Sequence, residues 1–258
     1  MIPEERRARI INKLNEKKVC SINELVRDLE VSRITIQRDI SILEKRGLIE
    51  KVHGGIKYKK DSFPRFETLF NARMDQNRDK KLEIAKKACG FVRDHSTIFI
   101  DSSSTCYFFV KELFMKDFLD LTIVTNSPAI QCEALNHPKH RIVSTGGLLN
   151  QHFGMFSGKW VIDFLQKINI HMAFISTAGV SQQLFLTTSN NELAEILRCV
   201  IEKTDEVNLL ADSSKFFKSA MLNIAHIERC KRIISDTELR NRINNTPFEG
   251  TDKIEIII

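Results

Sequence analysis

Polar runs rich in hydroxyl groups follow five apolar segments in the C-terminal two thirds of the chain. In the first run, at 101–105, Asp101 is followed by three serines and a threonine. Hydroxyls and backbone N–H groups at the start of a helix suit an anion, and the carboxylates of Asp101 and Asp212 suit sugar hydroxyls. Lys215, in the last run, would supply a countercharge to a phosphate. These residue types predict a site for a phosphorylated sugar, although each run alone fits a series of N-caps and turns equally well.

The elements that must position these runs alternate in the manner of an α/β protein. Near-continuous apolar segments separated by helical periodicity favour a mostly parallel sheet with helices on both faces. The carboxyl ends of parallel strands share one edge, where ligands bind, so we expect the five polar runs to meet in one crevice. We expect strands at 97–100, 121–125, 141–144, 172–175 and 207–210, helices at 82–92, 107–114, 128–135, 159–166 and 192–203, and an edge or a second small sheet from 232–234 and 253–258.

The formal charge of the chain is concentrated at its N-terminal end. Residues 1–60 hold 15 Lys and Arg against 9 Asp and Glu, so they carry the whole excess of +6, and residues 61–258 sum to zero. A short basic segment beside a neutral body is typical of a nucleic-acid-binding domain joined to a sensing domain. Six surface charges also fit a protein without that function, so the residue pattern has to decide.

Helical periodicity in the first 60 residues predicts a helix-turn-helix. A first helix is expected near 4–15, a second after the N-cap Ser21, and a third at about 33–45, which ends at Gly47. Two short helices, a tight turn and a third helix have the helix-turn-helix arrangement. This segment is therefore the candidate for DNA binding.

The third helix has one face for a core and one for DNA. At 100° per residue, the residues of its core face are Ile36, Ile40 and Leu43. On the opposite face, Ile34 suits the thymine methyl group, Arg38 suits guanine or a phosphate, and Gln37 at the flank suits adenine. Each of these residues alone fits an ordinary surface equally well, but together they favour a recognition helix.

Two short strands around a turn are expected after this helix. Apolar residues at 48–52 and 56–58 flank a His-Gly-Gly run that fits a hairpin turn. Such a wing would place several basic residues along the phosphate backbone of DNA. They are Lys51, His53, Lys57 and Lys59.

The segment 31–55 resembles a known family signature. Its sequence, VSRITIQRDISILEKRGLIEKVHGG, is similar to that of the DeoR family of bacterial transcriptional regulators, in which V-S-x-x-T-I-R-R-D-L precedes L-x-x-x-G and V-H-G-G. Gln37 replaces the family's first arginine and Ile34 its common acid, which should change the bases that are read and not DNA binding itself. The expected DNA-binding residues are Arg33, Ile34, Thr35, Gln37, Arg38, Ser41, Lys45, His53 and Lys57.

The body resembles the sensor domain of the same family, which is related in fold to sugar-phosphate isomerases and binds phosphorylated sugars. The run at 101–105 stands where the family has D-x-G-S-T, although Ser103 replaces the glycine. Departures at 176–178 and at Leu148 predict an unusual or weakly bound ligand. The resemblance implies effector binding by Asp101, Ser102, Ser103, Ser104, Thr105, Thr125, Asn126, Gly146, Gly147, Gly179, Glu192, Asp212 and Lys215.

The sequence thus predicts two domains and a connection. We expect a winged helix-turn-helix domain at 1–60, a linker at 61–79 and an effector-binding sensor domain at 80–258. The linker contains apolar anchors such as Phe63 and Phe70, so we expect it to lie against the body.

The function expected from both halves is ligand-controlled transcription. We expect a repressor of carbohydrate-metabolism genes that binds double-stranded operator DNA as a homo-oligomer, a dimer or tetramer, under control of a phosphorylated sugar. The alternative is an isomerase-like enzyme carrying a DNA-binding head, with Asp101, Glu192 or Asp212 as the base. The chain lacks the G-x-S-x-G, H-E-x-x-H, P-loop and G-x-G-x-x-G motifs, so we expect no enzyme. A third interpretation is an architectural DNA-binding protein whose body only oligomerises.

Other residue types indicate no metal site, cofactor or membrane span. His137 and His140 have no cluster of partners nearby in the sequence and fit a solvated turn. No apolar run approaches the ~20 residues that span a bilayer, and the N-terminus lacks the apolar core of a signal peptide. Because of this we expect a cytoplasmic protein. Its cysteines, expected to be reduced thiols, are Cys20, Cys89, Cys106, Cys132, Cys199 and Cys230.

Overall fold

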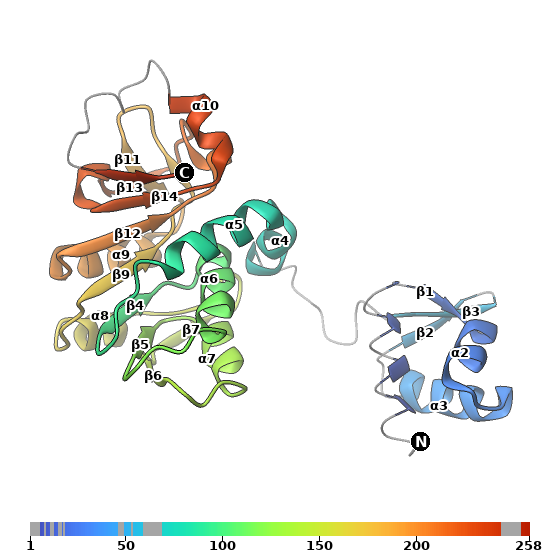
Figure 1. Cartoon of the computed structure of the whole chain (residues 1–258). Coiled ribbons are helices and arrows are strands. Elements are labelled where there is room, and N and C mark those ends of the chain that lie inside the picture. Colours follow the sequence, from blue (N-terminus) through green and yellow to red (C-terminus); the bar gives the residue numbers. More distant parts are fainter. Residues whose placement is uncertain are drawn as a thin grey trace. The chain divides into compact units, whose positions relative to one another are not determined.

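The computed structural model divides the chain into two compact units, residues 1–66 and 67–258 (Figure 1). The division lies within the segment expected as a linker, and each unit is described by itself. The structure describes residues 6–7, 9–10, 13–14, 17, 19–45, 49–52, 54–58, 69–243 and 254–258.

Two helices of the first unit form the predicted helix-turn-helix. They are α2 (Ile22–Leu29) and α3 (Arg33–Lys45). Ser21 caps α2, because its Oγ accepts the N–H of Glu24 at 3.1 Å, and Ser32 caps α3 by accepting the N–H of Thr35 at 3.2 Å. Such caps satisfy N–H groups that have no partner inside the helix. The described residues of the expected first helix are helical at 6–7, 9–10 and 13–14.

A three-stranded antiparallel sheet completes this unit. Its strands are β1 (Val19–Ser21), β2 (Ile49–Val52) and β3 (Gly55–Tyr58), in the order β1-β3-β2. The hairpin β2–β3 is the predicted wing, whereas β1 was not predicted. Gly55 allows β3 to approach β1 closely, because a Cβ atom there would lie 2.4 Å from the carbonyl oxygen of Cys20.

A seven-stranded parallel sheet forms the centre of the second unit, as the sequence predicted. Its order is β15-β14-β12-β9-β4-β5-β6. The order reverses next to β4, since later strands are added on both of its sides. The strands are β4 (Thr97–Ile100), β5 (Thr122–Thr125), β6 (Arg141–Ser144), β9 (Met172–Ile175), β12 (Glu206–Leu210), β14 (Arg232–Ile234) and β15 (Glu255–Ile257).

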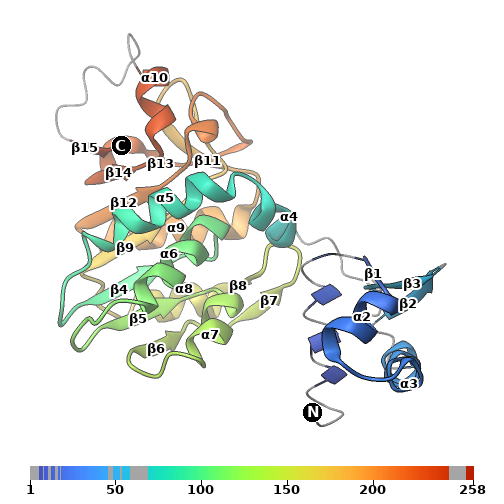
Figure 2. The same cartoon turned by 45° about the vertical axis from the view of Figure 1, so that its right-hand side comes forward.

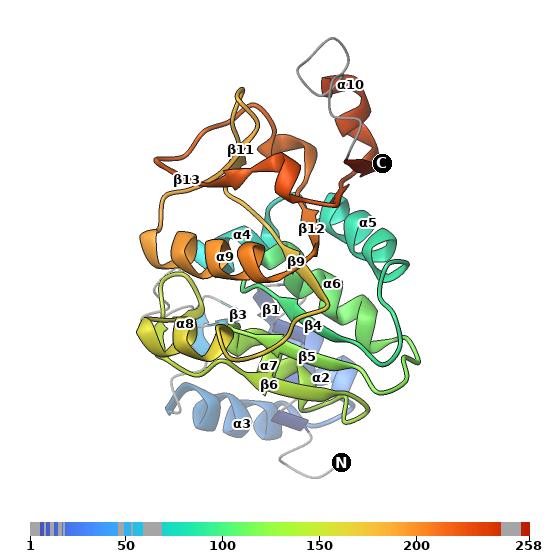
Figure 3. The ribbon, with the colours of Figure 1, turned by 90° about the vertical axis from the view of Figure 1, so that its left-hand side faces the viewer.

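Helices cover both faces of this sheet, because alternate strand residues point to opposite faces. Ile98 and Ile100 pack towards α5 (Arg78–Cys89), α6 (Ser104–Phe114) and α7 (Pro128–Ala134). Phe99 packs towards α8 (Lys159–Leu165) and α9 (Asn191–Lys203). Figure 2 shows α5 and α6 in front of the sheet, and Figure 3 shows α8 and α9 on the other side of it.

Short elements outside the main sheet were not predicted. A small antiparallel sheet contains β10 (Gly179–Val180), β11 (Phe185–Thr188) and β13 (Leu222–His226), and a hairpin contains β7 (Leu148–Asn150) and β8 (Met155–Ser157). The remaining helices are α4 (Leu69–Asp75), α10 (Arg240–Ile243) and the 3-10 helices η1 (Ser213–Lys215), η2 (Ile227–Arg229) and η3 (Thr237–Leu239). Strands of two to five residues show too little alternation to be recognised in a sequence.

Three further observations concern the sequence-based expectations. All six cysteines are free thiols, and Cys132 alone of them is exposed. The solvated turn expected at 137–140 is wrong for His140, which is 7% exposed and stacks on Phe114 at 5.9 Å between ring centroids. Within the described residues, no helix is long and apolar enough to cross a membrane.

Candidate functional site

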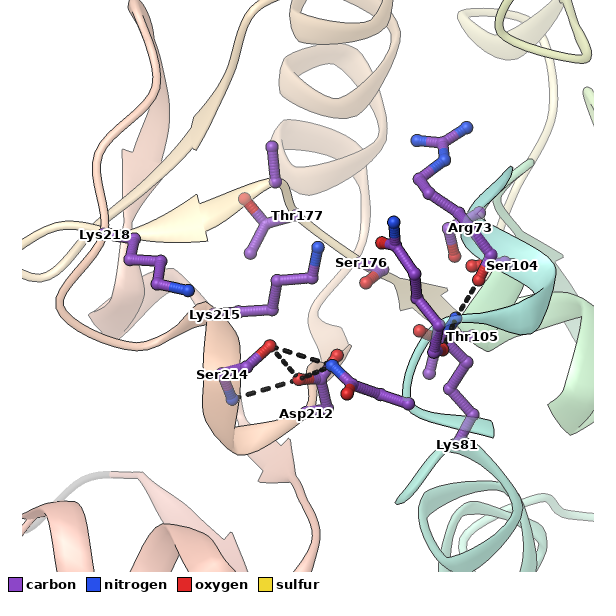
Figure 4. Close-up of a pocket in the computed structure, with 14 residues that line it drawn as sticks. Arg73, Lys81, Ser104, Thr105, Ser176, Thr177, Asp212, Ser214, Lys215 and Lys218 are labelled. Carbon is purple, nitrogen blue, oxygen red and sulfur yellow. Dashed lines mark hydrogen bonds between the residues drawn. The ribbon is translucent and has the colours of Figure 1, made fainter. Parts of the chain in front are cut away.

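A polar cavity of about 230 Å³ opens at the carboxyl ends of β4, β9 and β12. It lies beside the reversal of strand order, the place where open α/β sheets bind ligands. Its walls come from the loops after these strands, at 103–105, 176–178 and 212–215, and from 73–81, where α4 meets α5. We call it the lysine cavity because Lys81, Lys215 and Lys218 line it (Figure 4).

The N-terminus of α6 forms one wall of the lysine cavity. Ser103 is the N-cap residue, and its Oγ accepts the N–H of Cys106 at 3.1 Å. Ser104 and Thr105, the first two residues of the helix, line the cavity. The N–H groups of a first helical turn have no partner within the helix and carry the positive end of its dipole. This wall therefore attracts an anion.

Asp101 joins two of the loops. Its Oδ1 accepts the N–H of Ser103 at 2.8 Å, and its Oδ2 accepts the N–H of Ser176 at 2.7 Å. The residue is 1% exposed, and buried carboxylates need such partners. The structure thus gives Asp101 a role in positioning the loops, and its expected contact with a sugar hydroxyl stays a prediction.

Asp212 has one occupied and one unoccupied oxygen. Its Oδ1 accepts the N–H and hydroxyl of Ser214 and the Nδ2–H of Asn77, the last at 3.1 Å (Figure 4). Its Oδ2 is buried and has no hydrogen-bond partner in the described part of the chain. A buried acceptor without a donor costs free energy, so this atom suits a donor supplied from the cavity.

Two lysines bring positive charge to the cavity under partial burial. The pKa of Lys81 is lowered to about 8, mainly by burial; Asp212 opposes this shift, and the nearby charges of Lys215 and Arg73 contribute to it. The Nζ of Lys81 also donates to the carbonyl oxygen of Gln76 at 2.6 Å. Burial likewise lowers the pKa of Lys215, which extends from η1 towards the middle of the cavity in Figure 4. A bound anion would stabilise the charged form of both lysines.

A second cavity, of about 180 Å³, shares Arg73, Ser103 and residues 176–178 with the first. We call it the arginine cavity, because Arg73 is the one basic residue among the described residues that line it. Its other walls carry hydroxyls and apolar side chains, from Ser102, Thr188, Ser189, Phe153, Met155 and Leu193. The guanidinium of Arg73 donates to the carbonyl oxygen of Phe153 at 3.4 Å and points away from Lys81 in Figure 4.

The exposed face of α3 forms the candidate DNA surface in the first unit. Ile36, Ile40 and Leu43 are buried in the core, as the sequence predicted. Ile34 is 63% exposed, and this apolar side chain lies on the same helix as the exposed side chains of Arg33, Gln37 and Arg38. Thr35 and Ser41 are half-buried. A helix that presents apolar, amide and guanidinium groups to solvent has the chemistry to contact base edges.

The wing presents lysines that have acidic neighbours. Lys57 pairs with Glu50, and Lys51 pairs with Glu44 at 2.5 Å. Exposed ion pairs of this kind contribute little free energy, so a DNA phosphate would compete with them. His53 and the side chain of Lys45, both predicted to bind DNA, lie outside the described residues.

Comparisons with known proteins match the two units to two different domains. Residues 6–62 match the DeoR-like helix-turn-helix domain, and residues 76–237 match the DeoR C terminal sensor domain. The chain belongs to the DeoR family. It is a DNA-binding transcriptional regulator, as the sequence predicted.

Relatives within this family cover nearly the whole chain. It is 32% identical to the HTH-type transcriptional regulator GolR of Listeria innocua, over 96% of this chain and 95% of that protein. It is 28% identical to an L-fucose operon activator of Haemophilus influenzae, over 91% and 92%. Among solved structures, ribose 5-phosphate isomerase A of Methanocaldococcus jannaschii has a TM-score of 0.41 and 21% identity, over 54% of this chain and 55% of that one.

Several effector residues expected from the DeoR resemblance line neither cavity. They are Thr125, Asn126, Gly146, Gly147, Gly179 and Glu192. Thr125 is fully buried and donates its hydroxyl to the carbonyl oxygen of Ile100 at 2.7 Å. Glu192 accepts the Nδ2–H of Asn150 at 3.1 Å. The loops after β5 and β6, which carry Asn126, Gly146 and Gly147, lie on the far side of β4 from β9.

Gly179 of this DeoR regulator acts through backbone packing. A Cβ atom there would lie 2.3 Å from the carbonyl oxygen of Lys218. The N–H of Lys218 in turn donates to the carbonyl oxygen of Val180 at 3.0 Å. The glycine therefore allows the segment that carries Lys215 and Lys218 to lie against β10.

Several residues that line the lysine cavity were not predicted from the sequence. Arg73, Gln76 and Asn77 fell in the segment expected as a linker, and Lys81 was one of many helical lysines. Ser176 and Thr177 belong to a polar run that was noted but not assigned to the ligand. A cluster of basic residues next to the apolar anchors of 61–79 was the available signal for Arg73.

Proposed function

We propose that this DeoR regulator represses carbohydrate-metabolism genes and that a phosphorylated sugar in the lysine cavity controls its affinity for operator DNA. One observation supports the proposal most directly. The N-terminus of α6, the buried Lys81 and the half-buried Lys215 all line the same polar cavity. Backbone N–H groups with fixed positive charges are the usual protein partners of phosphate.

The phosphate binds at the α6 wall in this proposal. The N–H groups and hydroxyls of Ser104 and Thr105 donate to its oxygens, and Lys81 and Lys215 neutralise its charge. Lys218, exposed at the rim, attracts the ligand from solvent. The carbon chain extends towards the arginine cavity, where Arg73, Ser102 and Thr188 offer hydrogen-bond partners.

The first unit binds the operator through α3 in the major groove. Arg38 and Gln37 contact base edges, and Ile34 contacts a thymine methyl group. Arg33, Thr35, Ser41, Lys45, His53 and Lys57 contact the sugar–phosphate backbone or flanking bases. A homo-oligomer, dimer or tetramer, then matches repeated half-sites in double-stranded DNA. In this proposal the protein acts in the cytoplasm, where it reaches its operator DNA.

Ligand binding is transmitted through α4 in this proposal. This helix is the first described element after the connection between the two units, and its residue Arg73 lines both cavities. In this proposal α4 has two positions, and each goes with a different arrangement of the DNA-binding units in the oligomer. A ligand that binds more tightly to one position shifts the equilibrium towards the corresponding arrangement. Equal affinity for both arrangements would change nothing.

Repression is the simplest outcome for such a protein, because occupying a promoter requires only DNA binding. Activation requires a further contact with the transcription machinery. One relative is an L-fucose operon activator, so activation is the other outcome that the experiment below distinguishes.

We also infer that the body binds its ligand without converting it. An isomerase needs a carboxylate free to move a proton between sugar carbons. Both oxygens of Asp101 accept backbone N–H groups, and Glu192 lines neither cavity. Asp212, which lines the lysine cavity and has one oxygen without a partner in the described part of the chain, is the remaining candidate base, so the inference depends on the assay that follows. Incubation of the protein with pentose and hexose phosphates should return them unchanged, and turnover of any one of them would overturn this inference.

A gel-shift titration tests the proposed regulation. The DNA upstream of the gene is the probe, and the titrants are phosphorylated sugars, each paired with its unphosphorylated parent. A phosphorylated sugar should change operator affinity where its parent does not, and at a hundred times its Kd it should stabilise the protein by about 2.7 kcal/mol. Equal effects of both members of every pair would contradict a phosphate site. Transcription in vitro from the same promoter then separates repression from activation.

A further inference from the structure

We propose that Asp212 selects the ligand by accepting a hydrogen bond from a hydroxyl group near the phosphate ester. The inference rests on the proposed function, because it places the phosphate in the lysine cavity. It adds a defined chemical requirement to the ligand: a hydroxyl-bearing carbon within a few bonds of the phosphate. Phosphate esters that lack this hydroxyl should bind poorly.

The position of the Asp212 carboxylate is fixed by its occupied oxygen. Oδ1 accepts the N–H of Ser214 at 3.0 Å as the cap of η1, and it accepts the Nδ2–H of Asn77 from the start of α5 at 3.1 Å. These bonds come from two separate elements, so the carboxylate has little freedom to turn. The residue is 1% exposed. Oδ2, which is buried, is therefore held at one place beside the lysine cavity that Asp212 lines.

The Asp212 carboxylate interacts electrostatically with three nearby lysines. Burial lowers the pKa of Lys81 and Lys215, and the negative charge of Asp212 opposes that shift; it also contributes to the raised pKa of Lys80. The Nζ atoms of Lys80 and Lys81 donate elsewhere, to Ser213 Oγ at 2.8 Å and to the carbonyl oxygen of Gln76 at 2.6 Å. Within the described residues, Oδ2 has no donor.

A hydroxyl is the ligand group that fits this atom. A carboxylate oxygen accepts and cannot donate, and it repels phosphate. The hydroxyl must lie close to the phosphate, because one cavity of about 230 Å³ contains both the Asp212 side chain and the α6 wall in its lining. A site with a buried acceptor strongly rejects ligands that leave it unpaired.

Short phosphate esters test the requirement whichever sugar the protein recognises. Glycerol 3-phosphate carries hydroxyls next to the ester, and propyl phosphate has the same chain length without them. Calorimetric titration of the full chain should show glycerol 3-phosphate binding at least about tenfold more tightly, the ratio expected for a hydrogen bond to a charged acceptor. A ratio near one would overturn the proposal. Failure of both esters and of inorganic phosphate to bind would instead contradict the phosphate site.

The variant Asp212→Asn tests whether this residue reads the hydroxyl. The loss of its charge changes the affinity of both esters, but only the lost charge-assisted bond changes their ratio, which should fall to about threefold or less. An unchanged ratio would show that another group reads the hydroxyl.

Asp236→Asn is the matched control. Asp236 is also a buried N-cap carboxylate, on η3, and it also lies near Lys80, but it does not line the lysine cavity. The control should keep the ratio of the wild-type protein. A fall in both variants would assign the effect to charge or stability and overturn the role of Asp212.

Discussion

The two units of this DeoR regulator present their functional side chains in different ways. Ile34, Gln37 and Arg38 lie within five consecutive residues and share the exposed side of one helix. The lysine cavity combines residues between Arg73 and Lys218 from four separate segments. A surface on one element depends mainly on that element, whereas a cavity built from several loops depends on the bonds that hold the loops together. We therefore expect substitutions on the surface of α3 to change binding alone, and substitutions of residues that join the cavity loops to change stability as well.

The largest effect should follow from Asp101→Ala, which removes the bond between two loops. Two backbone N–H groups lose a charged acceptor, and the second unit should lose about 3 kcal/mol of unfolding free energy. Urea unfolding followed by circular dichroism measures the loss. The control is Asp94→Ala, since Asp94 accepts the N–H of Leu119 at 2.8 Å on the surface, where the cost should stay below about 1 kcal/mol. Equal losses in the two variants would contradict a special role for Asp101.

Lys215→Gln should weaken phosphate binding without unfolding the cavity. Loss of a charge-assisted hydrogen bond should cost about 2 kcal/mol of binding free energy. Titration with inorganic phosphate or with a phosphorylated sugar that binds the wild type measures it. Lys111→Gln, on the exposed side of α6, is the control and should bind normally. If both variants bind phosphate like the wild type, Lys215 does not contact the anion. Operator affinity without ligand should stay unchanged.

Arg38→Ala should affect only the other unit. Loss of a base or phosphate contact should reduce operator affinity by about 1.5 kcal/mol, with ligand binding unchanged. Arg240→Ala removes the same charge from an exposed position in the second unit, so a fluorescence anisotropy titration of both variants separates the contact from the net charge. Equal weakening by the two substitutions would contradict α3 as the recognition helix.

The smallest effect is a pH dependence of the cavity. Lys81, with its pKa of about 8, loses its proton as the pH rises from 7 to 9, and phosphate binds its protonated form. The affinity for inorganic phosphate should therefore fall by about 1 kcal/mol over this interval. Lys81→Met should remove the part of the slope centred near pH 8. A flat profile in the wild type would show that Lys81 keeps its proton or lies apart from the anion.

Sequence patterns predicted the parallel sheet and the two faces of α3, because both follow from short-range periodicity. They placed Ser103 to Thr105 next to the start of a helix, and these residues line the lysine cavity; their contact with a ligand stays a prediction. They did not distinguish these residues from Thr125 and Asn126, which also follow a strand at the same edge of the sheet. The order of strands decides which loops meet, and that order is set by packing between distant segments.

The sequence by itself determined the family, the helix-turn-helix and the polar character of the strand ends, because these are properties of consecutive residues. Only the tertiary structure decided that Arg73 and Lys81 join the cavity and that Asp101 holds its loops together. It also decided that one oxygen of Asp212 has no hydrogen-bond partner in the part of the chain that the structure describes. Burial and hydrogen-bond partners depend on segments more than a hundred residues apart, such as Asn77 and Asp212, and local patterns carry no information about such pairs.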